Sequence, residues 1–320
     1  MQNKPAVTVL AMCFNHERFV IEALESIRAQ TFQDFELIVT DDASRDGSPE
    51  LIAQWLREHR PDAHFIRHAS NAGLCPTLNE ALARARGDLI CMMATDDAWL
   101  PERLERHVAA MAEQPENVAV VYSDVAQMDE EGNALPENFI AYHRPGFVPP
   151  SGQVFPYMAD GNFIPAMGAT IRRSALTAVG NYDERLSYED YDMWLRLSAR
   201  YDFVFYPGLV ARYRIVSTSM VRTLFVRPTP HHSYTSYLIR RKWLDSELLS
   251  NAQRARWSDV LWEAAYNLYR HDDRRAVGAL WTAFRHGRKP RALLLAVAGT
   301  FGLSRGRLKR WFGTATQAAR

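Results

Sequence analysis

Short apolar segments alternate with longer amphipathic segments over the first 124 residues of the chain. The short segments are apolar throughout, which is typical of parallel strands buried on both faces of a sheet. The longer segments repeat apolar positions at helical spacing, and the last of them opens at Pro101, a residue favoured in a first helical turn. We therefore predict an α/β fold. The predicted strands are 7–14, 35–40, 64–68, 88–94 and 118–123, and the predicted helices lie around 18–29, 49–59, 76–86 and 101–113.

The pattern changes after Met128. Residues 128–161 are rich in turn formers and proline, which predicts loops. Further on, the sequence predicts a helix over 188–201 and strands at 166–173, 202–207 and 211–215. Beyond Val226 the apolar spacing is helical, with two amphipathic stretches separated by "RHDD". We expect a sheet-containing domain over residues 1–225 and a C-terminal helical region over 226–320.

Composition places the chain among ordinary globular proteins, with 47% hydrophobic and 23% charged residues. No segment approaches the roughly 20 apolar residues that a membrane-spanning helix needs. Cys13, Cys75 and Cys91 show no CxxC spacing, so we expect reduced thiols and a cytoplasmic location. The apolar segment near the N-terminus lacks a small-residue cleavage site and is predicted as a strand, not an export signal.

The net charge of +1 conceals an uneven distribution. No Asp or Glu follows Asp273, whereas 11 of the 38 Lys and Arg residues do, so the first 273 residues carry 27 basic against 37 acidic residues. An acidic body argues against nucleic-acid binding. The basic stretch 285–312 allows two interpretations. It is either a terminal helix packed on the body, or a peripheral contact with an anionic membrane, anchored by Trp311 and Phe312.

Polar residues follow three of the predicted strands. Asn15 comes after the first, Asp41-Asp42 after the second and Asp96-Asp97 after the fourth. In open α/β sheets ligands bind beyond the carboxyl ends of the strands. Although a single Asp at such a place is usually a turn or cap residue, four carboxylates at one edge repel each other unless a cation or hydrogen-bond donors offset them.

A hard divalent cation suits such an edge. Mg²⁺ and Mn²⁺ are held by one or two protein carboxylates together with phosphate oxygens, and the absence of a His/Cys cluster disfavours zinc. The segment "CFNHERF" after the first strand is neither a GxGxxG nor a P-loop motif, which argues against a dinucleotide site and a P-loop. These features indicate a diphosphate ligand held partly through a metal ion.

The ordered segments "VTVLAMCFNHERFVIEALESIRAQTFQDFELIVTDDASRDGS" and "GDLICMMATDDAWLPERLERHV" resemble the catalytic domain of family 2 glycosyltransferases. The resemblance covers roughly residues 5–215. It implies a GT-A, Rossmann-like, mostly parallel sheet with helices on both faces, and inverting transfer from a nucleotide sugar. It also implies five site residues. These are Asp97 on a Mn²⁺ or Mg²⁺ ion, Asp96 towards the ribose, Asp42 on the base, Phe14 stacked against that base, and Asp190 of "YEDYDMW" as general base.

Side-chain chemistry agrees with these roles. The carboxylate of Asp42 can only accept hydrogen bonds, which suits the imide N–H of uracil or thymine, or guanine N1–H. A UDP- or dTDP-sugar is therefore the favoured donor. Asp190 also has a structural interpretation, because acidic residues stabilise the first turn of a helix. Asp192 is expected on the helix surface. Two departures from the family pattern are Leu78, where an Arg is common, and Val216, where a His is common.

We thus expect a metal-dependent, inverting glycosyltransferase that acts on a saccharide or polyprenyl-linked acceptor in cell-surface polysaccharide or glycolipid synthesis. Its expected location is cytoplasmic, with peripheral contact to the inner face of the plasma membrane. One alternative is an inactive protein that only binds nucleotide sugars, since a fold does not establish activity. Another is a sugar nucleotidyltransferase, although the chain lacks the glycine-rich phosphate loop that this activity would need.

Overall fold

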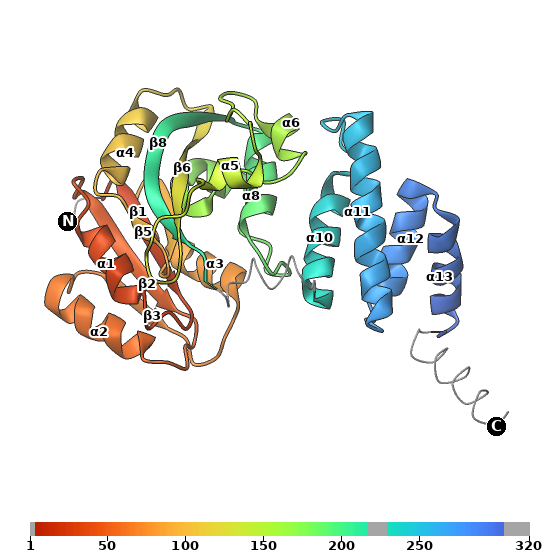
Figure 1. The fold of residues 1–320 in the computed structure, drawn as a ribbon, viewed down its shortest axis with the longest axis horizontal. Helices are drawn as coiled ribbons and strands as arrows, with labels where there is room; N and C mark the ends of the chain where they lie inside the picture. The colour runs from red at the N-terminus through yellow and green to blue at the C-terminus, as the bar shows by residue number, and fades with distance from the viewer. Residues whose placement is uncertain (1–3, 217–228, 304–320) are drawn as a thin grey trace. The chain divides into compact units, whose positions relative to one another are not determined.

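A computed structural model describes residues 4–216 and 229–303. These residues form two compact units. The first runs to Glu184 and resumes at Tyr188, and the second contains residues 185–187 and the helices from α10 onward (Figure 1). The strands of the first unit are β1 (Val7–Cys13), β2 (Phe35–Asp41), β3 (His64–Arg67), β4 (Leu89–Ala94), β5 (Ala98–Trp99), β6 (Val118–Met128), β7 (Ala169–Arg172) and β8 (Asp202–Arg214).

The strands join in one mixed sheet in the order β3-β2-β1-β4-β7-β6-β8-β5. β1 pairs in parallel with β2 and β4, and β6 pairs in parallel with β8. β7 lies antiparallel between β4 and β6, and β5 is antiparallel to β8. Every residue of β1 and β2 is buried, as the largely apolar pattern predicts for central parallel strands.

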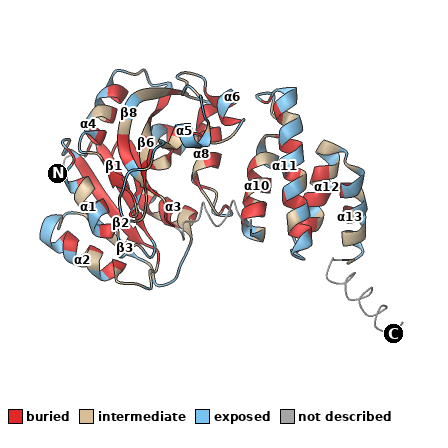
Figure 2. Ribbon diagram, in the orientation of Figure 1, coloured by how far each residue is buried: buried red, intermediate tan, exposed pale blue. Residues whose placement is uncertain are grey.

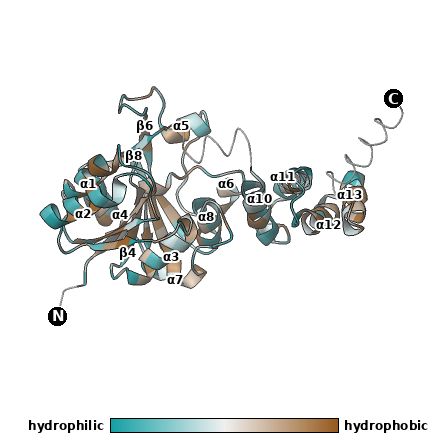
Figure 3. Cartoon of the chain, turned by 90° about the horizontal axis from the view of Figure 1, so that it is seen from below, coloured by the Kyte–Doolittle hydropathy of each residue, from teal (hydrophilic) through white to brown (hydrophobic). Residues whose placement is uncertain are grey.

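Helices cover both faces of the sheet. Figure 3 shows α1, α2 and α4 on one face and α3 and α7 on the other. This arrangement confirms the predicted α/β class. The helices and turns of the first unit are α1 (Val20–Arg28), α2 (Ser48–His59), α3 (Leu74–Arg84), α4 (Arg103–Ala112), α5 (Phe139–His143), α6 (Phe155–Met158), the 3₁₀ turn η1 (Ala166–Gly168), α7 (Arg173–Val179) and α8 (Asp190–Ser198).

The prediction of two separate strands at 202–207 and 211–215 is wrong, because β8 is continuous from Asp202 to Arg214. Pro207 and Gly208 do not end it. Gly208 has a φ of +109°, and the pairing of β6 with β8 shifts register on either side of Asp124. A bulge of this kind bends a strand without ending it. The continuous strand carries Arg214 to the sheet edge where β1 and β4 end.

The expected surface position of Asp192 is also wrong. α8 is buried on most sides, and the Asp192 carboxylate is fully buried, where it accepts a hydrogen bond from Arg196 Nε at 2.9 Å. Arg196 in turn donates to the backbone carbonyls of Val179 and Gly180, each at 2.9 Å. The pair therefore ties α8 to the end of α7. The sequence signal for this ion pair was the presence of an Asp and an Arg four residues apart on one predicted helix.

The second unit consists of successive helices, each packed on the next (Figure 1). Ser250 and Gln253 form a capping box at the start of the longest of them. None of the described helices combines the length and the apolar character that crossing a bilayer requires. The helices are α10 (Pro230–Trp243), α11 (Asn251–Arg270), α12 (Ala276–Gly287) and α13 (Pro290–Thr300).

Two helical ion pairs of equal spacing provide a test of how α8 is held. Asp192→Ala should lower the free energy of unfolding by about 3–5 kcal/mol, because it leaves a largely buried guanidinium without its carboxylate. The matched control is Glu102→Ala, which removes the exposed partner of Arg106 and should change stability by less than about 1 kcal/mol. Urea unfolding followed by circular dichroism measures both. Equal losses in the two variants would contradict a special role of the Asp192 pair.

Candidate active site at the carboxyl edge of the sheet

Two acidic loops flank the end of β1. The backbone N–H of Asp42 donates to the Cys13 carbonyl at 3.0 Å, and the N–H of Thr95 donates to the Met12 carbonyl at 2.9 Å. Because both loops are bonded to the last residues of the same strand, the segments carrying Asp42 and Asp96-Asp97 lie on opposite sides of β1. The expectation that the strand ends bring these acidic loops to one edge agrees with this arrangement.

The Asp97 side chain is held by a backbone group of β8. It is almost fully buried, and Oδ1 accepts a hydrogen bond from the backbone N–H of Arg214 at 2.8 Å. The neighbouring strand pair fixes this geometry, since Ala98 of β5 lies opposite Arg212 of β8. The orientation of Asp97 therefore depends on the register of β8.

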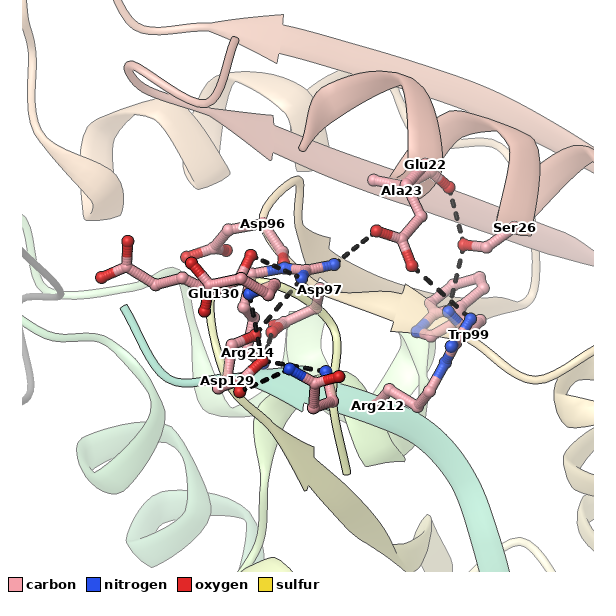
Figure 4. A network of polar contacts seen from close by, with 12 residues as sticks. Glu22, Ala23, Ser26, Asp96, Asp97, Trp99, Asp129, Glu130, Arg212 and Arg214 are labelled. Carbon is pink, nitrogen blue, oxygen red and sulfur yellow. Dashed lines mark hydrogen bonds and ion pairs between the residues drawn. The ribbon is translucent and has the colours of Figure 1, made fainter. Parts of the chain in front are cut away.

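The Arg214 guanidinium sits beneath the acidic loop (Figure 4). It is 2% exposed, and its Nε donates to the backbone carbonyl of Asp96 at 2.8 Å. Its other nitrogens reach the carbonyls of Asp129 and Glu130, at 3.4 and 3.3 Å, and form an ion pair with Glu22. The guanidinium also lies over the Phe19 ring, 4.6 Å from its centroid. Arg214 thus ties the acidic loop to α1 and to the loop after β6.

One oxygen of Asp97 has no partner. Oδ2 is buried and makes no hydrogen bond with the described residues. Burial, followed by the charge of Asp96, raises the pKa of Asp97 well above its usual range. A buried carboxylate oxygen without a donor has chemistry that suits a hard cation. Among the described residues, however, no three His, Cys, Asp or Glu side chains form a ready-made metal cluster. The site suits an ion that brings its remaining oxygen ligands from elsewhere.

Asp96 points towards the loop after β1. His16 Nε2 lies 3.7 Å from its Oδ2, and His16 Nδ1 lies 3.0 Å from the Thr95 hydroxyl. The side chain of Asp96 remains partly exposed. It is therefore the more accessible carboxylate of the couple, whereas Asp97 lies deeper.

Asp42 is buried and holds the loop before α3. Its Oδ1 accepts from the Ala72 N–H at 2.8 Å and lies 2.7 Å from His68 Nδ1, while Oδ2 accepts from the Gly73 N–H at 2.9 Å. The other ring nitrogen of His68 lies 2.9 Å from Glu80. Burial opposes the charged imidazole, but the hydrogen bonds to Asp42 and Glu80 raise the pKa of His68 overall. Three contacts on a carboxylate with about four lone-pair positions leave one open, on Oδ2.

Phe14 is the exposed aromatic residue beside Asp42. It follows β1 directly and leaves 43% of its surface accessible. The next residue, Asn15, adopts a φ of +59°, and its Oδ1 accepts from the Arg45 N–H at 2.8 Å. Asn tolerates this left-handed conformation better than most residues. The hydrogen bond joins the loops after β1 and β2, and the Phe14 side chain remains partly exposed to solvent.

Asp190 lies at the start of α8 and is half-buried. Its Oδ2 accepts from Asn162 Nδ2 at 2.6 Å, and Oδ1 accepts from the Tyr191 N–H at 2.6 Å. Burial raises the pKa of Asp190 to about 6, although both hydrogen bonds favour the charged form. Burial and the charge of Asp190 raise the pKa of the neighbouring Glu189 as well. A carboxyl with a pKa of about 6 is ionised at neutral pH yet is a stronger base than an ordinary Asp.

Tyr213 lies within electrostatic reach of both the Asp96-Asp97 loop and the start of α8. After burial, the charges of Asp97, Asp96 and Asp190 are the causes that raise the pKa of its hydroxyl. All three carboxyls therefore lie within electrostatic reach of one side chain at the end of β8. This convergence is the property on which an enzymatic interpretation of the acidic residues depends.

Sequence reasoning missed Asn162 and the guanidinium of Arg214. Asn162 lies in "GNFIP", a segment in which no residue could be given a role from sequence alone. Arg214 belongs to "YRI", two residues before Val216, and the family pattern points to a His near Val216 but not to this Arg. The signal for Arg214 was the need for donors among converging carboxylates. No sequence signal pointed to Asn162, because its contact with Asp190 spans 28 residues through irregular structure.

Comparisons with known proteins agree with the fold. The family described as "Glycosyl transferase family 2" matches residues 8–180. The Bacillus subtilis protein EpsE, named as a glycosyltransferase, is 32% identical over 201 residues, which are 61% of this chain and 68% of EpsE.

Two solved structures are similar at low identity. S. aureus TarS in complex with UDP-GlcNAc has a TM-score of 0.63 and 16% identity, over 90% of this chain and 83% of that chain. The mannosyltransferase PcManGT from Pyrobaculum calidifontis, in complex with GDP-Man and Mn²⁺, has a TM-score of 0.57 and 18% identity, over 97% and 84%. These likenesses support the GT-A fold. With the family match over more than half of its length, the chain belongs to glycosyl transferase family 2.

Proposed function

We propose that this glycosyltransferase moves a sugar from a nucleotide diphosphate donor to a hydroxyl acceptor in a single, inverting displacement. The observation that carries the proposal is that Asp96, Asp97 and Asp190, from separate segments, all lie within electrostatic reach of Tyr213 at the end of β8. Asp190, a carboxylate with a raised pKa, can act as a base, which fits direct attack of an acceptor hydroxyl on the anomeric carbon. The catalytic domain would then comprise residues 1–225, with a helical region over 226–320.

The donor's nucleoside would bind at Phe14, Asp42 and Asp96. The exposed Phe14 ring offers a stacking face, and the open position on Asp42 Oδ2 can accept one N–H of a base. The amides of Ala72 and Gly73 fix the direction of that acceptor. An acceptor-only group favours uracil or thymine, so we propose a UDP- or dTDP-sugar. The partly exposed Asp96 would accept from a ribose hydroxyl. TarS, crystallised with UDP-GlcNAc, supports a nucleotide sugar of this class.

Asp97 would hold a Mn²⁺ or Mg²⁺ ion. Its unpartnered Oδ2 fits such an ion, and the structure of PcManGT in complex with GDP-Man and Mn²⁺ supports a metal in this fold. When bound, the ion neutralises charge on the departing diphosphate. The hydrogen bond from Arg214 keeps Asp97 Oδ1 occupied, so Oδ2 is the oxygen left for the ion.

Asp190 would take the proton of the acceptor hydroxyl as that oxygen attacks. Its raised pKa makes it a stronger base, and the hydrogen bond from Asn162 keeps Oδ2 in a fixed direction. We propose a saccharide or a polyprenyl-linked saccharide as acceptor, in cell-surface polysaccharide or glycolipid synthesis. A lipid-linked acceptor would bring the enzyme to the inner face of the plasma membrane, with peripheral contact through 285–312, of which 304–312 lie outside the described residues.

Replacement of the base tests its role directly. Asp190→Asn should lower kcat by about 10²–10⁴-fold while donor binding is retained, because general-base assistance is lost. Thermal stability should not fall, since burial disfavours the charge that the substitution removes. Release of nucleoside diphosphate and calorimetric melting measure the two effects. Exposed Asp160→Asn serves as control, and substantial turnover by Asp190→Asn would show that another base is used.

The pH dependence tests the contact with Asn162. The rate should fall below about pH 6, where Asp190 takes up its proton. Asn162→Ala removes a donor that favours the carboxylate, so the folded-state pKa rises and the acid limb moves to higher pH, by roughly one unit. The profile of kcat/KM against pH measures the shift. An unchanged profile with a uniformly lower rate would mean that Asn162 only shapes the loop, and exposed Asn251→Ala should leave the profile unchanged.

Cation and donor binding test the other half of the site. UDP with Mn²⁺ should raise the melting temperature, because saturation to 100 times Kd contributes about 2.7 kcal/mol of stability. Asp97→Asn should abolish the Mn²⁺-dependent part of this shift, whereas Asp41→Asn lies outside the proposed metal site and should keep it. A panel of UDP-, dTDP- and GDP-sugars then identifies the base. Stabilisation by a donor without release of diphosphate, for every acceptor class tried, would favour the nucleotide-sugar-binding protein without activity.

A further inference from the structure

The last described helix, α13, packs with its small residues inward and its large apolar residues outward. Ala292 and Ala296 are buried against the preceding helix, and an added Cβ at Gly299 would meet Val277 Cγ2 of α12 at 2.8 Å. On the opposite side of α13, Leu294 is 69% exposed, Val297 38% and Phe301, which follows the helix, 79%. The spacing of these three residues places them on one helical face. Large apolar side chains are therefore accessible on the face of α13 opposite its buried alanines, while Leu293 and Leu295 are half-buried.

α12 extends the exposed apolar surface. Trp281 of α12 is 41% exposed. Its Nε1 donates to the Thr300 hydroxyl of α13 at 3.3 Å, so the indole lies across the junction of the two helices. In Figure 2, α13 is drawn mostly in the colours of intermediate and exposed residues. We call Trp281, Leu294, Val297 and Phe301 the C-terminal apolar surface.

Positive charge borders this surface. Arg285, Arg288 and Arg291 are exposed and form no ion pair with any residue that the structure describes. Nearby cationic groups are offset instead, since Lys289 pairs with Asp259 at 2.6 Å and His286 lies 3.7 Å from Asp245. Arg291 falls three residues before Leu294, on the same side of α13. The chain has no acidic residue after Asp273.

We propose that the C-terminal apolar surface and its three arginines dock on the surface of an anionic lipid bilayer. Charge complementarity selects this occupant, because unpaired arginines are attracted to acidic headgroups while neighbouring Leu, Phe and Trp side chains enter the boundary with the acyl chains. The helix lies in the plane of the interface, in accord with its short length. The proposal deepens the peripheral membrane contact that belongs to the proposed function, by naming the residues that make it, and docking itself requires neither a donor nor an acceptor.

Vesicle binding of the full chain tests the proposal. Sucrose-loaded vesicles with 30 mol% phosphatidylglycerol should pellet the protein with a partition coefficient at least about tenfold above that of pure phosphatidylcholine. The preference should weaken in 0.5 M salt, since screening shortens the reach of the charges. Leu294→Ser/Phe301→Ser and Arg285→Gln/Arg288→Gln/Arg291→Gln should each lower binding about tenfold or more.

Matched variants control for unspecific effects. Leu248→Ser/Val148→Ser removes two exposed apolar side chains outside this surface, and Arg57→Gln removes an exposed charge on α2; both should bind vesicles like the unmodified chain. Melting temperatures confirm that each variant is folded. Nucleoside diphosphate release with a water-soluble acceptor should be unchanged in all of them. If the unmodified chain binds vesicles but shows no sugar transfer, the proposed function is contradicted and this inference still holds.

Two results would overturn the inference. One is equal pelleting with anionic and neutral vesicles, or binding that neither set of substitutions reduces. The other is a dimer in sedimentation velocity that Leu294→Ser/Phe301→Ser converts to monomer, in the absence of vesicle binding. That second outcome would assign the surface to another copy of the chain.

Discussion

Electrostatic repulsion among the carboxylates at the carboxyl edge of the sheet is the force that the surrounding structure has to offset. The hydrogen-bond donors that offset the charge differ from one carboxylate to the next. Asp42 is held by two backbone amides and His68, Asp97 by the Arg214 amide, and Asp190 by Asn162 and its own helix start. Apart from the Tyr191 amide, these donors come from segments distant in sequence. The fold therefore gathers negative charge only where it also supplies hydrogen bonds.

The compensation is incomplete for two carboxyl groups of the proposed site, and burial leaves the pKa of Glu189 and Asp124 raised as well. Asp97 keeps a buried oxygen without a donor, and Asp190 keeps a pKa raised by burial. Each costs stability in the folded chain, as is common where a site is shaped for reaction and not for stability. By contrast, the buried carboxylate of Asp192 forms an ion pair with Arg196. Asp97 and Asp190 thus differ from Asp192, whose buried charge is paired within its own helix.

Much of this architecture was accessible from sequence because local rules govern it. Apolar strands with helical segments between them predict the sheet, and strand-end Asp pairs predict its acidic edge. What could not be predicted depends on contacts between distant residues. Asn162 meets Asp190 through loop structure without periodicity, and the junction at Gly208 depends on a bulge shared with β6. Asp192 was misplaced because the burial of α8 is set by its neighbours, not by its own pattern.

The pairing of β5 with β8 limits where insertions and deletions can be accommodated in this chain. The amide that orients Asp97 belongs to Arg214, two positions after the residue paired with Ala98. One residue gained or lost between Gly208 and Arg214 would reverse the sides on which all later side chains project. The guanidinium would then leave the acidic loop, and Asp97 would face a different amide. Insertions and deletions are consequently far better accommodated in the turn-rich stretch after β6 than in this half of β8.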